Sequence, residues 1–202
     1  RKKNAILFTY TLDVTTSEDD ALLEKLSGHK HVKLAPDTGY HFVAKASATE
    51  ALRPVVVGFG PCGMFAALIL AQSGFKPIIL ERGKKVRERT VDTFGFWRKR
   101  ELDPESNVQF GEGGAGTFSD GKLYSQIKDP KHYGRKVLTE FVKAGAPEEI
   151  MYVSKPHIGT FRLVGMVETM RAEIIELGGE IRFQQRVTDI VIEDGQVRGV
   201  KT

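Results

Sequence analysis

Three glycines and one glutamate have the types and spacing of a phosphate and ribose site. Gly58, Gly60 and Gly63 follow an apolar, β-branched run that ends at Val57, and Glu81 lies roughly 20 positions after Gly60. In such a site the first glycine allows a tight turn, the second lets the backbone approach a pyrophosphate, and the third lets a helix pack on the strand. The spacing predicts a site for an adenine dinucleotide.

The elements around these glycines are predicted to be a strand, a helix and a second strand. Residues 53–57 suit a strand that is buried on both faces of a parallel sheet. Pro61 suits a first helical turn, and the apolar run 64–71 continues a helix that Gly74 can end. The unpaired N–H groups at the helix start would face the phosphates, so Pro61 and Cys62 are candidate cofactor contacts.

Glu81 follows the second predicted strand, which covers residues 78–80. Its carboxylate would accept both hydroxyls of a ribose and would repel a 2′-phosphate. The site therefore favours the adenosine of FAD or NAD over that of NADP. The alternative is a glycine-rich surface turn without a ligand.

A second glycine-rich stretch covers residues 111–123. Residues 116–122 nearly match a phosphate loop, but Leu123 stands where a magnesium-binding hydroxyl is needed, and no apolar strand leads into the stretch. We therefore reject an ATPase. Exposed backbone N–H groups still form an anion site, to which Thr117, Ser119 and Lys122 add donors. The stretch predicts a second polar ligand-binding loop.

Together, the residues 58–63, 81–83, 107–123 and 155–160 resemble a family of largely uncharacterised bacterial FAD-dependent dehydrogenases. That family is similar to glutathione-reductase-type flavoproteins. The resemblance implies that Glu81 binds the adenosine ribose of FAD and that the loop 113–121 lies towards the pyrophosphate and the isoalloxazine. The loop residues implied as cofactor contacts are Gly114, Ala115, Gly116, Thr117 and Ser119.

The chain departs from that family at two positions and in length. Cys62 stands where a small residue such as Ala is expected, and Phe161 stands where an acid is expected. The second departure is expected to alter the active-site side. Proteins of the resembled family are much longer, so the chain is expected to be a fragment.

Residues 82–100 contain a clear excess of Lys and Arg over acids. Val86, Thr90, Phe94 and Trp97 recur at helical spacing, which predicts an amphipathic helix with its apolar face on the sheet and a basic face in solvent. A nucleic-acid surface is the alternative, which we do not favour. Arg82 or Arg89 could also reach the phosphates of FAD as bidentate donors.

The C-terminal part of the chain predicts a helix and then a small β unit. Leu163, Val167, Met170 and Ile174 share one face of a helix over residues 161–177, which Thr160 caps. Three strands are predicted next, with a tight turn at 194–195 between the last two; they cover residues 181–187, 189–193 and 196–200. In flavoproteins of the resembled class the first such strand ends beside the adenine, which implies a backbone contact from Val187.

We expect two domains. Residues 1–52 would form a small α/β unit, with strands over 6–14 and 40–46 around a helix that Ser17 caps. Residues 53–202 would form a Rossmann-like FAD/NAD(P)-binding α/β domain with a parallel sheet, helices and a β-meander. Both are expected to be incomplete.

The composition and the spacing of cysteine and histidine limit which redox, membrane and metal sites the chain can have. The chain has 202 residues, a net charge of +4, and one cysteine, which excludes an internal disulfide and a paired-thiol redox site. No apolar run is long enough for a membrane span or a secretory signal, so a cytoplasmic protein is expected. His29 and His31 lack other ligands at metal-site spacing, and a structural role is favoured for His157. No metal site is predicted.

The sequence therefore predicts an FAD-dependent oxidoreductase that works by hydride transfer, with NAD(P)H as a candidate reductant. It predicts neither the small-molecule substrate nor a catalytic residue. We expect no membrane partner and no nucleic-acid partner. Two alternatives stay open, an NAD-dependent dehydrogenase that uses the first motif alone and a flavin- or RNA-binding module without turnover.

Overall fold

The structure of the chain, a computed structural model, describes residues 7–47 and 52–202. The chain divides into two compact units, residues 1–38 and 39–202. The first unit contains helix α1 (Asp19–Lys25), which buries none of its residues. The predicted domain boundary after residue 52 remains a prediction.

The strands predicted near the N-terminus are wrong for the described residues. Residues 7–16 and 40–46 form no strand, and position 6 lies outside the described chain. The predicted helix is confirmed, but its N-cap is Glu18 rather than Ser17. Alternation of apolar residues makes a strand only when a partner strand supplies the backbone hydrogen bonds, and no strand of the described chain pairs with these segments.

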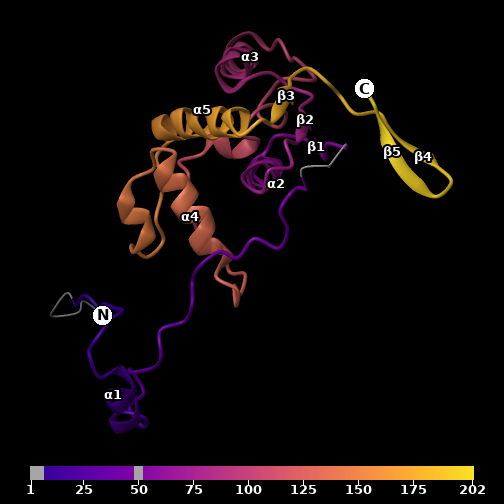
Figure 1. Cartoon of the computed structure of the whole chain (residues 1–202). Coiled ribbons are helices and arrows are strands. Elements are labelled where there is room, and N and C mark those ends of the chain that lie inside the picture. Colours follow the sequence, from indigo (N-terminus) through magenta and orange to yellow (C-terminus); the bar gives the residue numbers. More distant parts are fainter. Residues whose placement is uncertain (1–6, 48–51) are drawn as a thin grey trace. The chain divides into compact units, whose positions relative to one another are not determined.

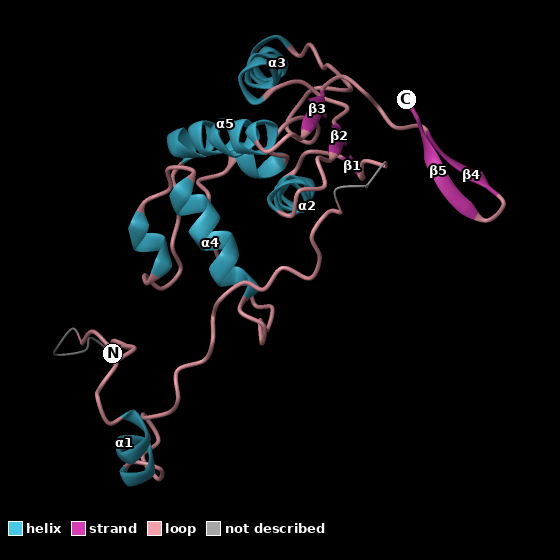
Figure 2. Ribbon diagram, in the orientation of Figure 1, coloured by secondary structure: helices cyan, strands magenta, loops and turns pink. Residues whose placement is uncertain are grey.

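A three-stranded parallel sheet forms the centre of the second unit (Figures 1 and 2). Strand β1 (Val55–Val57), helix α2 (Pro61–Gln72) and strand β2 (Ile78–Leu80) follow each other, and β1 pairs with β2 in parallel. Strand β3 (Glu180–Arg182) pairs in parallel with the other edge of β2. The predicted α/β fold with a Rossmann-like strand, helix and strand unit is confirmed.

Two strand predictions need correction. Val55 and Val57 are 43% and 59% exposed, because β1 is an outer strand of the described sheet and is not buried on both faces. The strand predicted over residues 181–187 ends at Arg182 and joins the parallel sheet instead of a meander. It is short because its partner β2 has only three residues.

Three longer helices complete this unit, and they are α3 (Val86–Lys99), α4 (Tyr133–Lys143) and α5 (Thr160–Glu176). Short 3₁₀ turns lie at η1 (Ala115–Phe118) and η2 (Glu148–Met151). The predicted buried face of α5 is confirmed at Leu163, Val167, Met170 and Ile174. Thr160 is not the cap, since its hydroxyl donates to the Ser119 carbonyl. Helix α4 was not predicted.

The core lies where α2 and α5 pack on each other and on the sheet. Beside it, a polar network joins α2, α4 and α5. Glu140 is 1% exposed and accepts hydrogen bonds from Lys136 Nζ at 2.7 Å and from Lys143 Nζ at 3.0 Å. Gln72 donates to both Glu140 and Glu173. Because its buried charge is paired and hydrogen-bonded, Glu140 can lie between the helices.

The last two strands form the predicted hairpin. Strand β4 (Asp189–Glu193) pairs antiparallel with β5 (Gln196–Lys201). Asp194 and Gly195 between them have φ angles of 50° and 72°. Two positive φ angles are typical of the two-residue turn that matches the twist of a hairpin.

Helix α3 buries the predicted apolar face only at its first residue, Val86. Val86, Arg89 and Thr93 are buried, whereas Phe94 and Trp97 are 42% and 54% exposed. The prediction of an apolar face on the sheet is therefore wrong for the second half of the helix. Arg89 takes the inward position because its guanidinium donates hydrogen bonds to the neighbouring loop. Within the described chain, no helix combines the length and the hydropathy that crossing a membrane requires.

Candidate dinucleotide site

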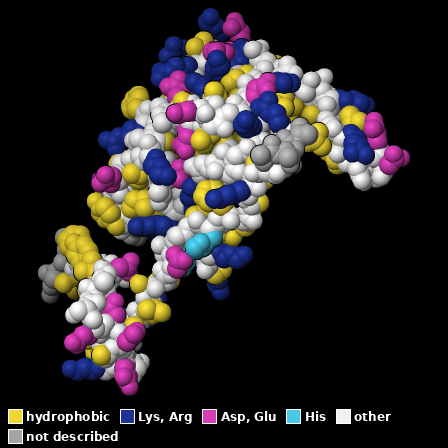
Figure 3. Space-filling view, viewed as in Figure 1, with side chains coloured by type: hydrophobic (Ala, Val, Ile, Leu, Met, Phe, Trp, Pro, Cys, Tyr) yellow, Lys and Arg dark blue, Asp and Glu magenta, His cyan; other side chains and the backbone are white. Residues whose placement is uncertain are grey.

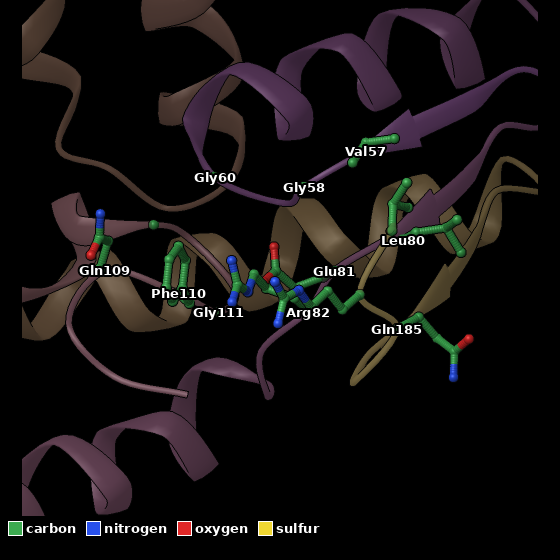
Figure 4. A pocket seen from close by; sticks show the side chains of 13 residues that line it. Val57, Gly58, Gly60, Leu80, Glu81, Arg82, Gln109, Phe110, Gly111 and Gln185 are labelled. Atoms are coloured by element: carbon green, nitrogen blue, oxygen red, sulfur yellow. The ribbon is translucent and has the colours of Figure 1, made fainter. Parts of the chain in front are cut away.

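A cavity of about 330 Å³ lies at the carboxyl ends of β1 and β2 (Figure 4). In open parallel sheets, ligands bind outside these strand ends. Four segments line the cavity, namely the turn after β1, the end of β2, the glycine-rich loop (residues 107–123) and the chain after β3. The lining residues are Val57, Gly58, Gly60, Leu80, Glu81, Arg82, Gln109, Phe110, Gly111, Gly114, Gln185, Arg186 and Val187.

The turn from β1 into α2 presents backbone N–H groups without acceptors. The first helical hydrogen bond runs from Met64 N to Gly60 O at 2.9 Å, and Pro61 has no N–H. Within the described chain, the N–H groups of Gly60, Cys62 and Gly63 donate no hydrogen bond. These groups lie at the positive end of the helix, where an anion is stabilised.

Gly63 permits this turn. A Cβ at this position would collide with the carbonyl oxygen of Gly58. Gly58 itself has a φ angle of 89°, in the region that favours glycine. The predicted steric roles of these two glycines, in a tight turn and in close helix packing, agree with this geometry.

Glu81 is buried and ties the turn to the end of β2. It is 4% exposed, and its Oε2 accepts a hydrogen bond from Phe59 N at 2.7 Å. Its Oε1 accepts one from Gly83 N at 2.8 Å. A carboxylate oxygen has a second lone pair, so both oxygens can still accept a ribose hydroxyl. The sequence did not indicate this structural role.

Arg89 holds the glycine-rich loop. It is fully buried, and its three guanidinium nitrogens donate to loop carbonyl groups, including Nη1 to Glu112 O at 2.6 Å and Nη2 to Val108 O at 2.7 Å. The other carbonyl acceptors belong to Asn107, Gly111 and Gly114. The phosphate contact predicted for Arg89 is not supported by this geometry, because every guanidinium nitrogen already donates to the loop.

Burial lowers the pKa of Arg89 to about 10, although the carboxylates of Glu81 and Glu112 oppose this shift. The guanidinium therefore stays protonated at neutral pH. A buried cation that donates to several carbonyl groups keeps most of its solvation through the protein.

The loop lies directly on the turn. Gly113 N donates to Phe59 O at 2.8 Å, and a Cβ at Gly114 would lie 3.0 Å from Pro61 Cδ. A Cβ at Gly83 would lie 2.5 Å from Gly111 Cα. Glycines on both sides thus let two backbones approach each other beside the cavity.

We expect Gly114→Ala to lower the free energy of unfolding by about 1–2 kcal/mol, because Gly114 has a φ angle of 61° and its Cβ would press on Pro61. Chemical denaturation measures this change. The control is Gly95→Ala in α3, where a Cβ would meet no atom within 4 Å. Equal stability of the two variants would contradict the close contact.

Arg82 and Phe110 form one wall of the cavity (Figure 4). The Arg82 guanidinium carbon lies 3.7 Å from the centre of the Phe110 ring, and Nε donates to Glu105 Oε2 at 2.7 Å. Arg186 donates to the other oxygen of Glu105 at 3.1 Å. Gln109, Phe110 and Gln185 were not predicted as site residues; the only signal was that Gln109 and Phe110 fall within the stretch that carries the family resemblance.

Glu112 is a buried carboxylate at the start of α3. Its Oε2 accepts from Val86 N at 2.8 Å and from Arg171 Nη1 at 2.7 Å, while Oε1 has no partner within the described chain. Burial raises the pKa of Glu112 above its usual range, although Val86 and Arg171 oppose this. Between the usual and the raised pKa, the folded state binds more protons than the unfolded state. The contribution of Glu112 to the free energy of unfolding therefore falls as pH rises through this window.

Glu112→Gln abolishes this titration. We expect the melting temperature of the unmodified protein, relative to that of Glu112→Gln, to be higher at about pH 5 than at about pH 8. Comparing the two proteins at each pH cancels the opposite effect of carboxylates with lowered pKa values, such as Glu105 and Glu168. A difference that does not change with pH would contradict the assignment.

The structure divides the sequence-predicted site residues into groups. Those that line the cavity are Gly58, Gly60, Glu81, Arg82, Gly114 and Val187. A second cavity is lined by Pro61, Gly116, Thr117 and Ser119, among others. Cys62, Gly63, Ala115 and Arg89 line neither cavity. Within the described residues, no cluster of three or more His, Cys, Asp or Glu side chains could hold a metal ion.

No protein-family model matches the chain. The chain is 45% identical over 200 residues to an uncharacterized protein of Clostridium beijerinckii, and the match covers 99% of this chain and 37% of that protein. It is 29% identical over 160 residues to the dual trans-enoyl reductase/FAD-dependent monooxygenase tazHJ of Aspergillus terreus, covering 74% of this chain and 20% of that protein. The chain thus spans little more than a third of the first relative's length.

Two solved structures show a limited similarity to the chain. THI4 of Thermovibrio ammonificans has a TM-score of 0.43 at 19% identity, covering 90% of this chain and 49% of that one. The 3-ketosteroid-delta4-(5alpha)-dehydrogenase of Rhodococcus jostii has a TM-score of 0.44 at 15% identity, covering 78% and 44%.

Proposed function

We propose that this chain binds FAD and forms part of an FAD-dependent oxidoreductase. One observation carries the proposal. The N–H groups of Gly60, Cys62 and Gly63, which have no acceptor within the described chain, lie at a helix start, in the turn that borders a cavity containing a buried carboxylate, Glu81. An adenine dinucleotide requires hydrogen-bond donors for its pyrophosphate and an acceptor for its ribose hydroxyls at the carboxyl ends of the strands.

The residues present fit that cofactor. The turn would donate to the pyrophosphate, and Glu81 would accept from the ribose with lone pairs that Phe59 and Gly83 leave free. The wall of Arg82 and Phe110 offers a flat surface at the same cavity. When bound, FAD supplies hydride chemistry. The contribution of this chain is to hold the adenosine half of FAD and to place the glycine-rich loop beside it.

FAD is favoured over other dinucleotides for two reasons. The Glu81 charge disfavours the 2′-phosphate of NADP. A relative that matches over 74% of the chain is named an FAD-dependent monooxygenase. NAD remains the alternative cofactor for the first motif. NAD(P)H is proposed as a reductant that binds the protein at a different site. Since the chain spans 37% of the length of the Clostridium beijerinckii relative, the substrate and the complete activity belong to the whole protein.

The experiment is a titration of the purified chain with FAD, followed by flavin absorbance and fluorescence, with parallel calorimetric titrations of NAD and NADP. We expect saturable FAD binding that is at least tenfold tighter than NAD binding, with NADP weakest. Tighter binding of NAD than of FAD would replace the flavoprotein proposal with an NAD-dependent dehydrogenase.

We do not propose a nucleic-acid partner, although Lys and Arg side chains gather where α3 lies (Figure 3). Arg87 pairs with Glu168 and Lys84 with Asp92, so part of this charge is neutralised. The expected result in a fluorescence anisotropy titration is no specific binding of single-stranded RNA at physiological salt. Tight binding that weakens steeply with salt, and that Arg98→Glu abolishes, would contradict this expectation.

A further inference from the structure

A second cavity, of about 220 Å³, lies on the other side of the contact between the turn and the loop. Gly60 and Gly114 line the first cavity, and the adjoining residues Pro61 and Gly113 line the second. Its volume exceeds the roughly 150 Å³ of an apolar cavity that holds benzene. It can therefore hold a compact organic molecule.

The interior of this cavity is apolar. Side chains from α2, α4 and α5 form it, and they are Met64, Phe65, Phe141, Leu163, Met166 and Val167. Four of these are buried in the core, from 3% exposed at Met64 to 7% at Leu163. A ligand with many polar atoms would lose its hydration here without gaining partners, so the interior selects hydrocarbon.

The polar side of the cavity is the glycine-rich loop, where most polar groups are already satisfied. The Ser119 hydroxyl donates to Gly116 O at 2.7 Å, and the Thr117 hydroxyl donates to Glu112 O at 3.4 Å. Among the described residues of the lining, Lys122 is the one that carries a charge. Its ammonium lies 3.3 Å from Asp120, and both side chains are more than half exposed. A pair this exposed is weak, so a ligand carboxylate can take the place of Asp120.

We propose that the second cavity binds a compact apolar carboxylate, with its hydrocarbon among the core side chains and its charge on Lys122. Binding depends on this cavity alone, whereas the role of that ligand as a substrate rests on the proposed FAD function. An isoalloxazine fits the cavity less well, because its several ring nitrogens and carbonyl groups would face apolar side chains.

The methionines allow a direct test. The sequence has four Met residues, and the two that line this cavity are Met64 and Met166. Met151 and Met170 do not line it and serve as internal controls. We would label the methionine methyl groups with ¹³C and titrate the full chain with benzoate and, separately, with its neutral analogue benzyl alcohol. The expected result is a saturable shift of the Met64 and Met166 methyl signals while the other two stay in place.

A lysine variant tests the carboxylate. Lys122→Gln should raise the Kd of benzoate about three- to tenfold and leave the Kd of benzyl alcohol unchanged, whereas Lys128→Gln, a lysine outside the lining, should change neither. No methyl shift at saturating benzoate, or equal shifts of all four methyl groups, would overturn the proposal. FAD that shifts the Met64 and Met166 signals and blocks benzoate would assign the cavity to the cofactor instead. FAD binding is measured independently, by flavin absorbance, so a failure of either proposal is distinguishable from a failure of the other.

Discussion

Arg89→Met is expected to lower the free energy of unfolding by about 3–5 kcal/mol, because it leaves a buried set of carbonyl groups without donors. Arg89 is fully buried and donates to five carbonyl groups of the loop at distances from 2.6 to 3.2 Å. Methionine has a similar length but no donor, so these oxygens would lose their partners. Denaturant unfolding followed by circular dichroism measures the change.

The matched control is Arg87→Met on the same helix. Arg87 has a side chain that is 72% exposed and pairs with Glu168 at 2.7 Å. Surface pairs contribute about 0–1 kcal/mol, so this variant should stay close to the unmodified protein. If Arg89→Met were no less stable than Arg87→Met, Arg89 would not hold the loop. Arg89→Lys should remain impaired, because one ammonium cannot replace a guanidinium fork.

Glu81→Ala is expected to weaken FAD binding by about 100-fold or more and to lower the free energy of unfolding by about 2–3 kcal/mol. The affinity falls because the ribose loses its acceptor, and because the turn that presents the N–H groups loses its anchor. The stability falls because the N–H groups of Phe59 and Gly83 lose a charged acceptor. A fluorescence titration gives the first value, and denaturant unfolding gives the second.

Glu105→Gln is the control for Glu81→Ala. Glu105 is also a carboxylate near this cavity, but its side chain is 38% exposed and it binds Arg82 and Arg186. We expect at most a few-fold change in FAD affinity, since neither the turn nor the ribose acceptor is altered. Equal losses in the two variants would mean that Glu81 has no specific role in the site.

The middle of the fold could be predicted from the sequence because its signals are local. The β-branched run before Gly58 and the apolar helix after Pro61 follow from steric demands within a few residues, and the acid at position 81 follows from its spacing of roughly 20 residues from Gly60. The buried stripe of α5 follows from helical periodicity in the same way.

The errors concern long-range pairing. Alternating apolar residues near the N-terminus form no strand in the described chain, because alternation does not supply a partner. Strand β3 stops at Arg182 because β2 offers only three residues to pair with. Helix α3 turns Arg89 inward because carbonyl groups of the loop, roughly 20 positions away in the sequence, accept its hydrogen bonds. Helical periodicity alone favoured Phe94 and Trp97 for that face.

The candidate site could likewise be predicted only where its signals are local. Glycine spacing indicated Gly58, Gly60 and Gly63, of which the first two line the first cavity. The family resemblance implied Gly114, which also lines it. Phe110 could not be assigned, because its role depends on the stack with Arg82 across a loop without regular structure. The division of the predicted loop residues between two cavities depends on tertiary packing that no local pattern records.

The proposed function depends above all on binding of the FAD pyrophosphate by the turn before α2, which amide NMR can follow residue by residue. The ¹⁵N-labelled chain would be titrated with FAD while the amide signals of Gly60, Cys62 and Gly63 are recorded. We predict large shifts of these three signals. The signals of Gly95 and Gly165 should change little, because these residues lie outside both cavities. Saturable FAD binding that leaves the three turn signals in place would contradict this proposal.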